Sequence, residues 1–216
     1  MRWGQWPIIL IRVLGELTGN TGYNEIRLLG RSLSALADSL SLLLVYAIGR
    51  RLYGHRVGLL GTALSSLAVL QIQQSHFMTV DNFAVLFSTA SLFLLVLIST
   101  ELCITKAGGE ENGYRISRKG FLLFIFFGVA LGMTLSSRIN LLPLAGMLLI
   151  AVFLSVADLK ISNRADLHKI VGLSLILIAV ALLSTIATFR VTQPMSFRAA
   201  DGDTSIFTVQ LNPDWV

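Results

Sequence analysis

The sequence predicts an all-α fold: a polytopic bundle of about six membrane-spanning helices behind an N-terminal interfacial helix. Three observations predict it. Apolar residues make up 54% of the 216 residues, and charged residues only 13%, whereas a soluble domain carries about a quarter charged residues. The mean hydropathy is +0.74. The apolar residues form runs long enough to cross a bilayer, and short basic connectors separate these runs.

Residues 1–31 are predicted to form a segment on the outer face of the membrane. Between Trp3 and Leu17, aliphatic and tryptophan residues alternate with Gln5, Arg12 and Glu16. This mixture is typical of a short amphipathic helix whose tryptophans lie at the level of the lipid headgroups. A poor spanning helix is the alternative interpretation.

Residues 32–189 are predicted to be the transmembrane region. A spanning helix needs roughly 17–25 apolar residues, and six runs approach that length. They are 32–49, 57–73, 82–100, 120–137, 141–157 and 170–189. The polar residues 190–216, with Pro194, Gly202 and Pro213, are predicted to begin an external loop.

The connectors alternate in charge. The first, third and fifth contain ten basic residues, whereas the second and fourth contain one, Arg138. The ten are Arg50, Arg51, Arg56, Lys106, Arg115, Arg118, Lys119, Lys160, Arg164 and Lys169. The positive-inside rule places these connectors in the cytoplasm and both chain ends outside, in a multi-pass protein of the plasma membrane. This distribution accounts for the net charge of +5 without a nucleic-acid partner.

The single cysteine, Cys103, lies in a connector that we place in the cytoplasm. It has no second cysteine with which to form an internal disulfide, so we expect no redox chemistry there.

The predicted topology gathers polar residues on the outer face. Asp81 begins the third span, and a carboxylate near lipid is costly unless it is paired, solvated or bound to a cation. We therefore treat Asp81 as a candidate catalytic group and metal ligand; a helix N-cap together with Asn82 is the alternative. His76 is a candidate acid, base or metal ligand, and a hydrogen bond to the backbone is its alternative.

Four arginines on the outer face run against the positive-inside trend and favour an anionic, phosphate-bearing ligand there. Arg138 lies with Asn140 between the fourth and fifth spans, Arg190 closes the sixth span, and Arg27 and Arg31 precede the first. For each arginine the alternative is snorkelling to the interface.

Asp38 lies within the first predicted span. Acidic residues inside a membrane are candidates for function. A structural contact between Asp38 and a polar group of a neighbouring helix is an equally supported interpretation.

Several stretches resemble a known group of enzymes. They are 30–38 (GRSLSALAD), 49–61 (GRRLYGHRVGLLG), 74–83 (QSHFMTVDNF) and 189–197 (FRVTQPMSF). They resemble the GT-C type membrane glycosyltransferases, in the branch of the protein O-mannosyltransferases and aminoarabinose transferases. The likeness is greatest to the "YYY" membrane proteins of that group, and it covers about residues 3–213.

The resemblance implies a polyprenyl-phosphate-linked sugar as donor and an active site at the outer membrane face. Asp81 would match the acidic residue of the second external loop, which shapes the catalytic centre and can assist a divalent metal. Arg31, Arg138 and Arg190 would be candidates for binding the phosphate of the carrier. The partners implied are membrane lipid, the lipid-linked sugar and an acceptor that the sequence does not identify.

The chain also departs from this group. Such enzymes have a preceding span and an early acidic motif that supplies the principal catalytic carboxylate, and neither Glu16 nor Glu25 stands in a matching motif. We expect a fragment of such an enzyme, or a reduced relative, that is not active by itself; its standing as an enzyme is left open. A multi-pass transporter and a non-catalytic membrane scaffold are the rival interpretations. Against the transporter, no pair of predicted spans is interrupted by Gly or Pro near the midplane.

Overall fold

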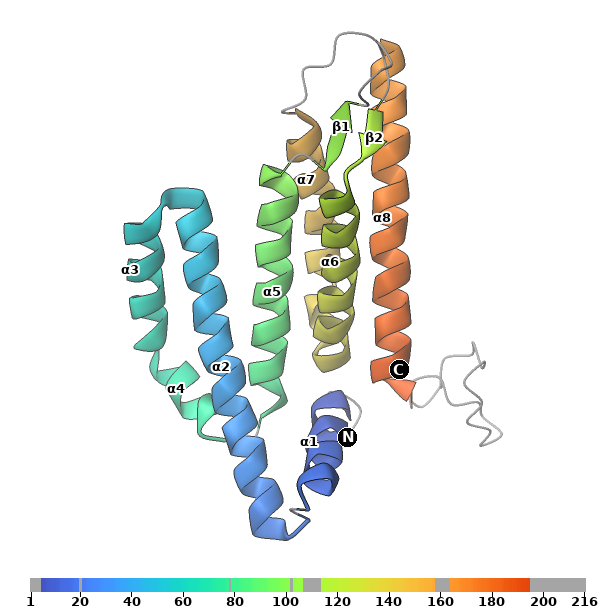
Figure 1. Cartoon of the computed structure of the whole chain (residues 1–216). Helices are drawn as coiled ribbons and strands as arrows, with labels where there is room; N and C mark the ends of the chain where they lie inside the picture. The colour runs from blue at the N-terminus through green and yellow to red at the C-terminus, as the bar shows by residue number, and fades with distance from the viewer. Residues whose placement is uncertain are drawn as a thin grey trace, which may run out of the picture.

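The computed structural model describes residues 5–19, 21–77, 79–101, 103–106, 114–157 and 164–194, which form a bundle of helices (Figure 1). In chain order the helices are α1 (Gln5–Thr18), α2 (Tyr23–Tyr53), α3 (His55–Ser66), α4 (Val69–Ser75), α5 (Val80–Thr100), α6 (Arg118–Ser137), the 3-10 turn η1 (Ile139–Leu141), α7 (Pro143–Ala157) and α8 (Arg164–Thr192). Two short strands, β1 (Ile104–Lys106) and β2 (Tyr114–Ile116), pair antiparallel between α5 and α6.

The predicted all-α membrane bundle is confirmed. In the described part of the chain, five helical segments are long and apolar enough to cross a membrane, and the bent pair α3–α4 is a possible sixth. The five are α2, α5, α6, η1 with α7, and α8. Two helices extend beyond the predicted runs. α2 begins at Tyr23, before the run 32–49, and α8 continues to Thr192, past the run 170–189. Residues 195–216, in which most of the predicted external loop falls, lie outside the described residues.

The second predicted span, 57–73, is not a single helix. α3 and α4 meet at an angle of 66°. Ala68 has an extended backbone at the break, and Ser66 Oγ donates to the Ala63 carbonyl at 2.8 Å. After the bend, Gln71 Nε2 donates to Asp38 Oδ1 at 2.5 Å. After the bend, a polar residue of α4 thus hydrogen-bonds to the carboxylate of Asp38 inside the first span. This agrees with the interpretation of Asp38 as a structural contact with a neighbouring helix.

α6 lies at the centre of the larger group of helices, between α5 and α8 (Figure 1). Phe124, Phe127 and Leu131 of α6 are almost completely buried. Gly128 and Gly132 face α8, and a Cβ on Gly132 would lie 2.7 Å from Thr188 Cβ. Lipid supplies little hydrophobic drive for helix association, so this close approach between backbones holds α6 and α8 together.

α1 is amphipathic and short. Its 14 residues span about 21 Å, less than the hydrocarbon core of about 30 Å. Trp6 and Ile11 are buried against the bundle, whereas Ile9 and Val13 are exposed. α1 lies beneath the ends of α5 and α6 (Figure 1). Its position at the membrane surface stays a prediction.

The turns between the helices lie at two opposite ends of the bundle. α1, the α4–α5 turn, the α6–α7 turn and the last turn of α8 lie at one end, together with both ends of the described chain (Figure 1). The α2–α3 turn and the strands, with Arg50, Arg51 and Arg56 nearby in the sequence, lie at the other. The outer-face residues predicted from the sequence therefore do come to one end of the molecule. Which side of the membrane that end faces stays a prediction.

Candidate functional site

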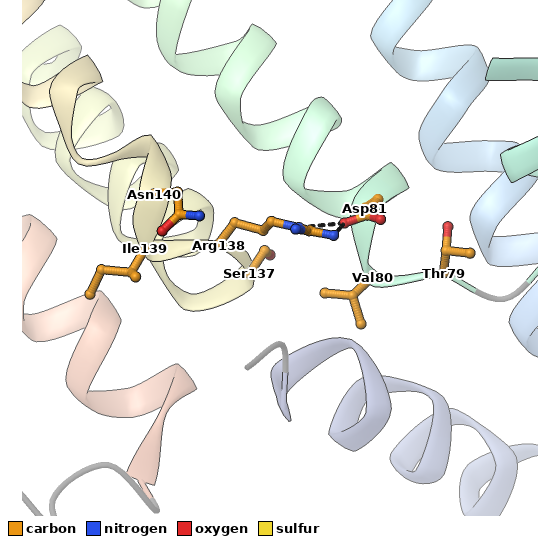
Figure 2. Close-up of a pocket in the computed structure, with 7 residues that line it drawn as sticks. All are labelled: Thr79, Val80, Asp81, Ser137, Arg138, Ile139 and Asn140. Carbon is orange, nitrogen blue, oxygen red and sulfur yellow. Dashed lines mark hydrogen bonds and ion pairs between the residues drawn. The ribbon is translucent and has the colours of Figure 1, made fainter. Parts of the chain in front are cut away.

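An ion pair between Asp81 and Arg138 forms the centre of the candidate site. Arg138 Nε donates to Asp81 Oδ1 at 2.5 Å, and Arg138 Nη2 contacts the same oxygen (Figure 2). The two residues are 57 positions apart in the chain. The side chains are 54% exposed for Arg138 and 31% exposed for Asp81. An ion pair this open contributes about 1 kcal/mol or less, so a competing anion can displace one partner.

Asp81 lies in the first turn of α5, where the partial positive charge of the helix N-terminus favours a carboxylate. The N-cap position belongs to Thr79, with an extended backbone, so the N-cap interpretation of Asp81 with Asn82 is wrong. Asn82 Nδ2 instead donates to Ser34 Oγ at 2.9 Å and to the Gln74 carbonyl at 3.0 Å. These two bonds tie the start of α5 to α2 and α4, which leaves the carboxylate of Asp81 available to the site.

Arg138 follows the last residue of α6. Its backbone is extended, with φ −148° and ψ 112°, and its N–H still donates to the Thr134 carbonyl at 2.9 Å. The chain then makes the turn η1 and enters α7 at Pro143, a residue that suits the first position of a helix. This abrupt exit from α6 places the guanidinium across the gap to α5 (Figure 2).

A cavity of about 590 Å³ opens beside the ion pair. It is lined from two turns, by Thr79, Val80, Asp81, Ser137, Arg138, Ile139 and Asn140 (Figure 2). Its volume lies within the range of about 300–1,000 Å³ found for small-molecule sites. One acid, one guanidinium and one amide therefore converge on a space of the size that small-molecule ligands occupy.

The other predicted site residues lie away from this cavity. His76 is exposed at the end of α4, and its Nδ1 donates to the Ile72 carbonyl at 2.7 Å, which is the backbone bond named as its alternative. Arg31 is exposed on α2, and Arg190 lies in the last turn of α8. Of the predicted residues, the structure brings Asp81, Arg138 and Asn140 together and leaves His76, Arg31 and Arg190 outside the lining.

The described residues offer few ligands for a divalent metal. In the described part of the chain, no group of three or more His, Cys, Asp or Glu side chains is arranged to hold a metal ion. The carboxylate of Asp81 pairs with Arg138, so a metal ligand here would be a single carboxylate that has left its ion pair. Metal ligation by Asp81 stays a prediction, and the chemistry proposed below does not use it.

Two residues at the site, Trp6 and Ser137, were not predicted from the sequence to be part of it. Trp6 Nε1 donates to Ser137 Oγ at 2.8 Å in a buried hydrogen bond. The Trp6 ring also packs edge-on against Phe83 and Phe87 of α5, with centroid distances of 5.4 and 5.2 Å. A tryptophan in an amphipathic helix has an obvious role at the headgroups, and nothing in its local sequence indicates a partner 131 positions away.

Comparison with known proteins places the chain in a family. The bundle of apolar spanning helices defines the chain as an integral membrane protein. The family model described as dolichyl-phosphate-mannose-protein mannosyltransferase matches residues 16–193, and the chain belongs to this family of membrane glycosyltransferases. No curated protein and no solved structure matches the chain significantly. The match favours the glycosyltransferase interpretation over the transporter.

Proposed function

We propose that the chain supplies a donor-phosphate site and a catalytic carboxylate for mannosyl transfer. The donor is dolichyl-phosphate mannose, and the acceptor is a hydroxyl group of a protein at the outer face of the membrane. One observation carries the proposal: Arg138 and Asp81 meet at one cavity at the end of the spans, in a chain whose family is described by this donor.

The proposed reaction uses the two charges in different roles. The acceptor oxygen attacks C1 of mannose from the face opposite the phosphate, and the bond between C1 and the phosphate oxygen breaks with its electron pair on that oxygen. The acceptor proton passes to the carboxylate of Asp81, acting as general base. Arg138 faces the phosphate, whose negative charge grows as dolichyl phosphate leaves. Its attraction is therefore stronger in the transition state than in the ground state, as catalysis requires.

The resting ion pair fits this sequence of events. Without donor, each charge neutralises the other near lipid, where an isolated charge is costly. A phosphate offers Arg138 two oxygens in the geometry that a guanidinium prefers. When Arg138 binds phosphate, the carboxylate of Asp81 is released to accept a proton. Asn140, which lines the same cavity, is a further hydrogen-bond donor for the phosphate.

We propose that Arg31 and Arg190 contact the anionic carrier outside the cavity. Arg190 lies in the last turn of α8, and α2, which carries Arg31, begins at the same end of the bundle (Figure 1). We assign them to the approach of the anionic carrier, because neither lines the cavity.

Binding of dolichyl phosphate to the full chain in lipid nanodiscs tests the phosphate site. We expect Arg138→Gln to weaken binding about tenfold or more, in keeping with the loss of a charged hydrogen bond. Arg51→Gln is the matched control, since Arg51 pairs with Glu101 at 2.6 Å near the opposite end of the bundle. Equal affinity for the two variants would contradict the phosphate site. Inorganic phosphate, added as a competitor, shows whether the headgroup alone is recognised.

The proposed base has its own test. The assay uses the full-length enzyme of which this chain is expected to be a part, with labelled dolichyl-phosphate mannose and an acceptor peptide. There, Asp81→Asn is expected to abolish mannose transfer while expression and dolichyl-phosphate binding are retained. Retained transfer in this variant would restrict Asp81 to neutralising Arg138.

A further inference from the structure

Trp6 joins the two helix ends that carry the proposed site. Its indole N–H bonds to Ser137, directly before Arg138, and its ring packs on Phe83, two residues after Asp81. Trp6 is 8% exposed and Ser137 is 1% exposed. One buried side chain of α1 therefore contacts both the start of α5 and the end of α6.

We propose that Trp6 is a positioning residue that sets the distance between Asp81 and Arg138. This inference rests on the function proposed above. An ion pair as open as that of Asp81 and Arg138 is too weak to hold two helix ends in register. A buried hydrogen bond with two edge-on aromatic contacts is stronger and more directional. The spacing of the two charges thus depends on α1, none of whose described side chains lines the cavity.

The outer side of α1 explains why such a connection is useful. Ile8, Ile9, Val13 and Leu17 are all at least 40% exposed, as in a helix held at a membrane surface. With α1 at the membrane surface, as the sequence predicts, Trp6 would hold Asp81 and Arg138 near the depth of lipid phosphates.

Dolichyl-phosphate binding to the full chain in nanodiscs tests the role of Trp6. Trp6→Phe keeps an aromatic ring but loses the N–H, and Ser137→Ala loses the acceptor of the same bond. We expect each to weaken binding roughly three- to tenfold, the loss that one buried hydrogen bond produces. Tyr46→Phe is the matched control: it also removes one side-chain hydrogen bond, the 2.7 Å bond to His55 near the α2–α3 turn at the opposite end of the bundle, and should bind as the parent chain does.

The decisive comparison repeats Trp6→Phe in an Arg138→Gln background. If Trp6 acts by placing Arg138, the substitution has no further effect on affinity there. The same fold-loss in both backgrounds would make Trp6 a general structural residue and overturn the proposal, as would no loss in either. Should Trp6→Phe fail to fold, Ser137→Ala is measured in the same two backgrounds. It removes the same bond, and a direct effect of Ser137 as a cavity-lining residue would persist in the Arg138→Gln background.

A separate measurement keeps this inference distinct from the proposed function. If the parent chain does not bind dolichyl phosphate, the proposed function fails. Melting temperatures of Trp6→Phe, Arg138→Gln and the double variant then test the link alone. Non-additive changes support positioning of the ion pair by Trp6, whereas additive changes refute it.

Discussion

Asp81 and Arg138 are each unfavourable near lipid alone, and together they form a site that a substrate can open. The carboxylate benefits from the N-terminus of α5, and the guanidinium extends from the end of α6. Their exposure keeps the pair weak enough for a phosphate to replace the carboxylate. At the scale of single residues, this exchange is the step on which the proposed chemistry depends.

Cys103 gives a residue-scale prediction that is independent of catalysis. Burial, and then the negative charge of Glu101, raise the pKa of the Cys103 thiol from 9.0 to about 11. Only the thiolate reacts with alkylating reagents. Labelling of the folded chain at pH 8 should therefore be slow, and should accelerate as the pH approaches 11 or after denaturation. Cys103 is the only cysteine, so the label reports on it alone.

The same shift affects stability at high pH. The folded state keeps the thiol proton more tightly than the unfolded state does. This contribution to stability is fully present below about pH 9 and is lost as the pH rises through about 11. For the labelling experiment at Cys103, rapid reaction of the folded chain at pH 8 would contradict a buried, neutral thiol.

At the scale of helices, contact between α6 and α8 organises the larger group of spans. Gly132 lies against Thr188 and the Thr185 carbonyl, and Gly128 lies against the Ala181 carbonyl. Such pairs of glycines four residues apart allow two backbones to approach closely. α6 can then present Ser137 to α1 and Arg138 to α5.

Gly132→Ala tests this contact. An added Cβ would lie 2.7 Å from Thr188 Cβ and 2.8 Å from the Thr185 carbonyl oxygen, so α6 and α8 must move apart. We expect a loss of about 1–3 kcal/mol, as in other overpacked cores, seen as a lower melting temperature in detergent. Gly172→Ala in α8 is the control, because its Cβ would have no neighbour within 4 Å. Equal melting temperatures for the two variants would contradict tight packing at Gly132.

Several elements could be predicted from the sequence because their signals are local. Hydropathy alone places the spans, and Asp81, Arg138 and Asn140 were grouped because alternating basic connectors assign their turns to one end. The break between α3 and α4 has no Gly or Pro to mark it, and the hydrogen bond of Gln71 to Asp38 that accompanies it joins residues 33 positions apart. The ion pair and the Trp6–Ser137 bond depend on which helices become neighbours, and hydropathy carries no such information.

At the scale of the whole molecule, the chain has two chemically different ends. One end carries the cavity, the ion pair and α1. The other carries the strands and the α2–α3 turn (Figure 1), which is flanked in the sequence by Arg50, Arg51 and Arg56. This division agrees with a donor site at the outer membrane face and basic connectors in the cytoplasm, the orientation that we propose. Membership in the mannosyltransferase family gives the cavity end its proposed ligand.

Exchanging the two charges tests the central claim most directly. The double variant Asp81→Arg with Arg138→Asp keeps an ion pair between α5 and α6, but reverses its direction in the cavity. We predict that it melts nearer to the parent chain than either single variant does, and that dolichyl-phosphate binding and mannose transfer stay lost. Full recovery of both binding and transfer in the exchanged variant would contradict the assignment of the phosphate to Arg138 and of the proton to Asp81.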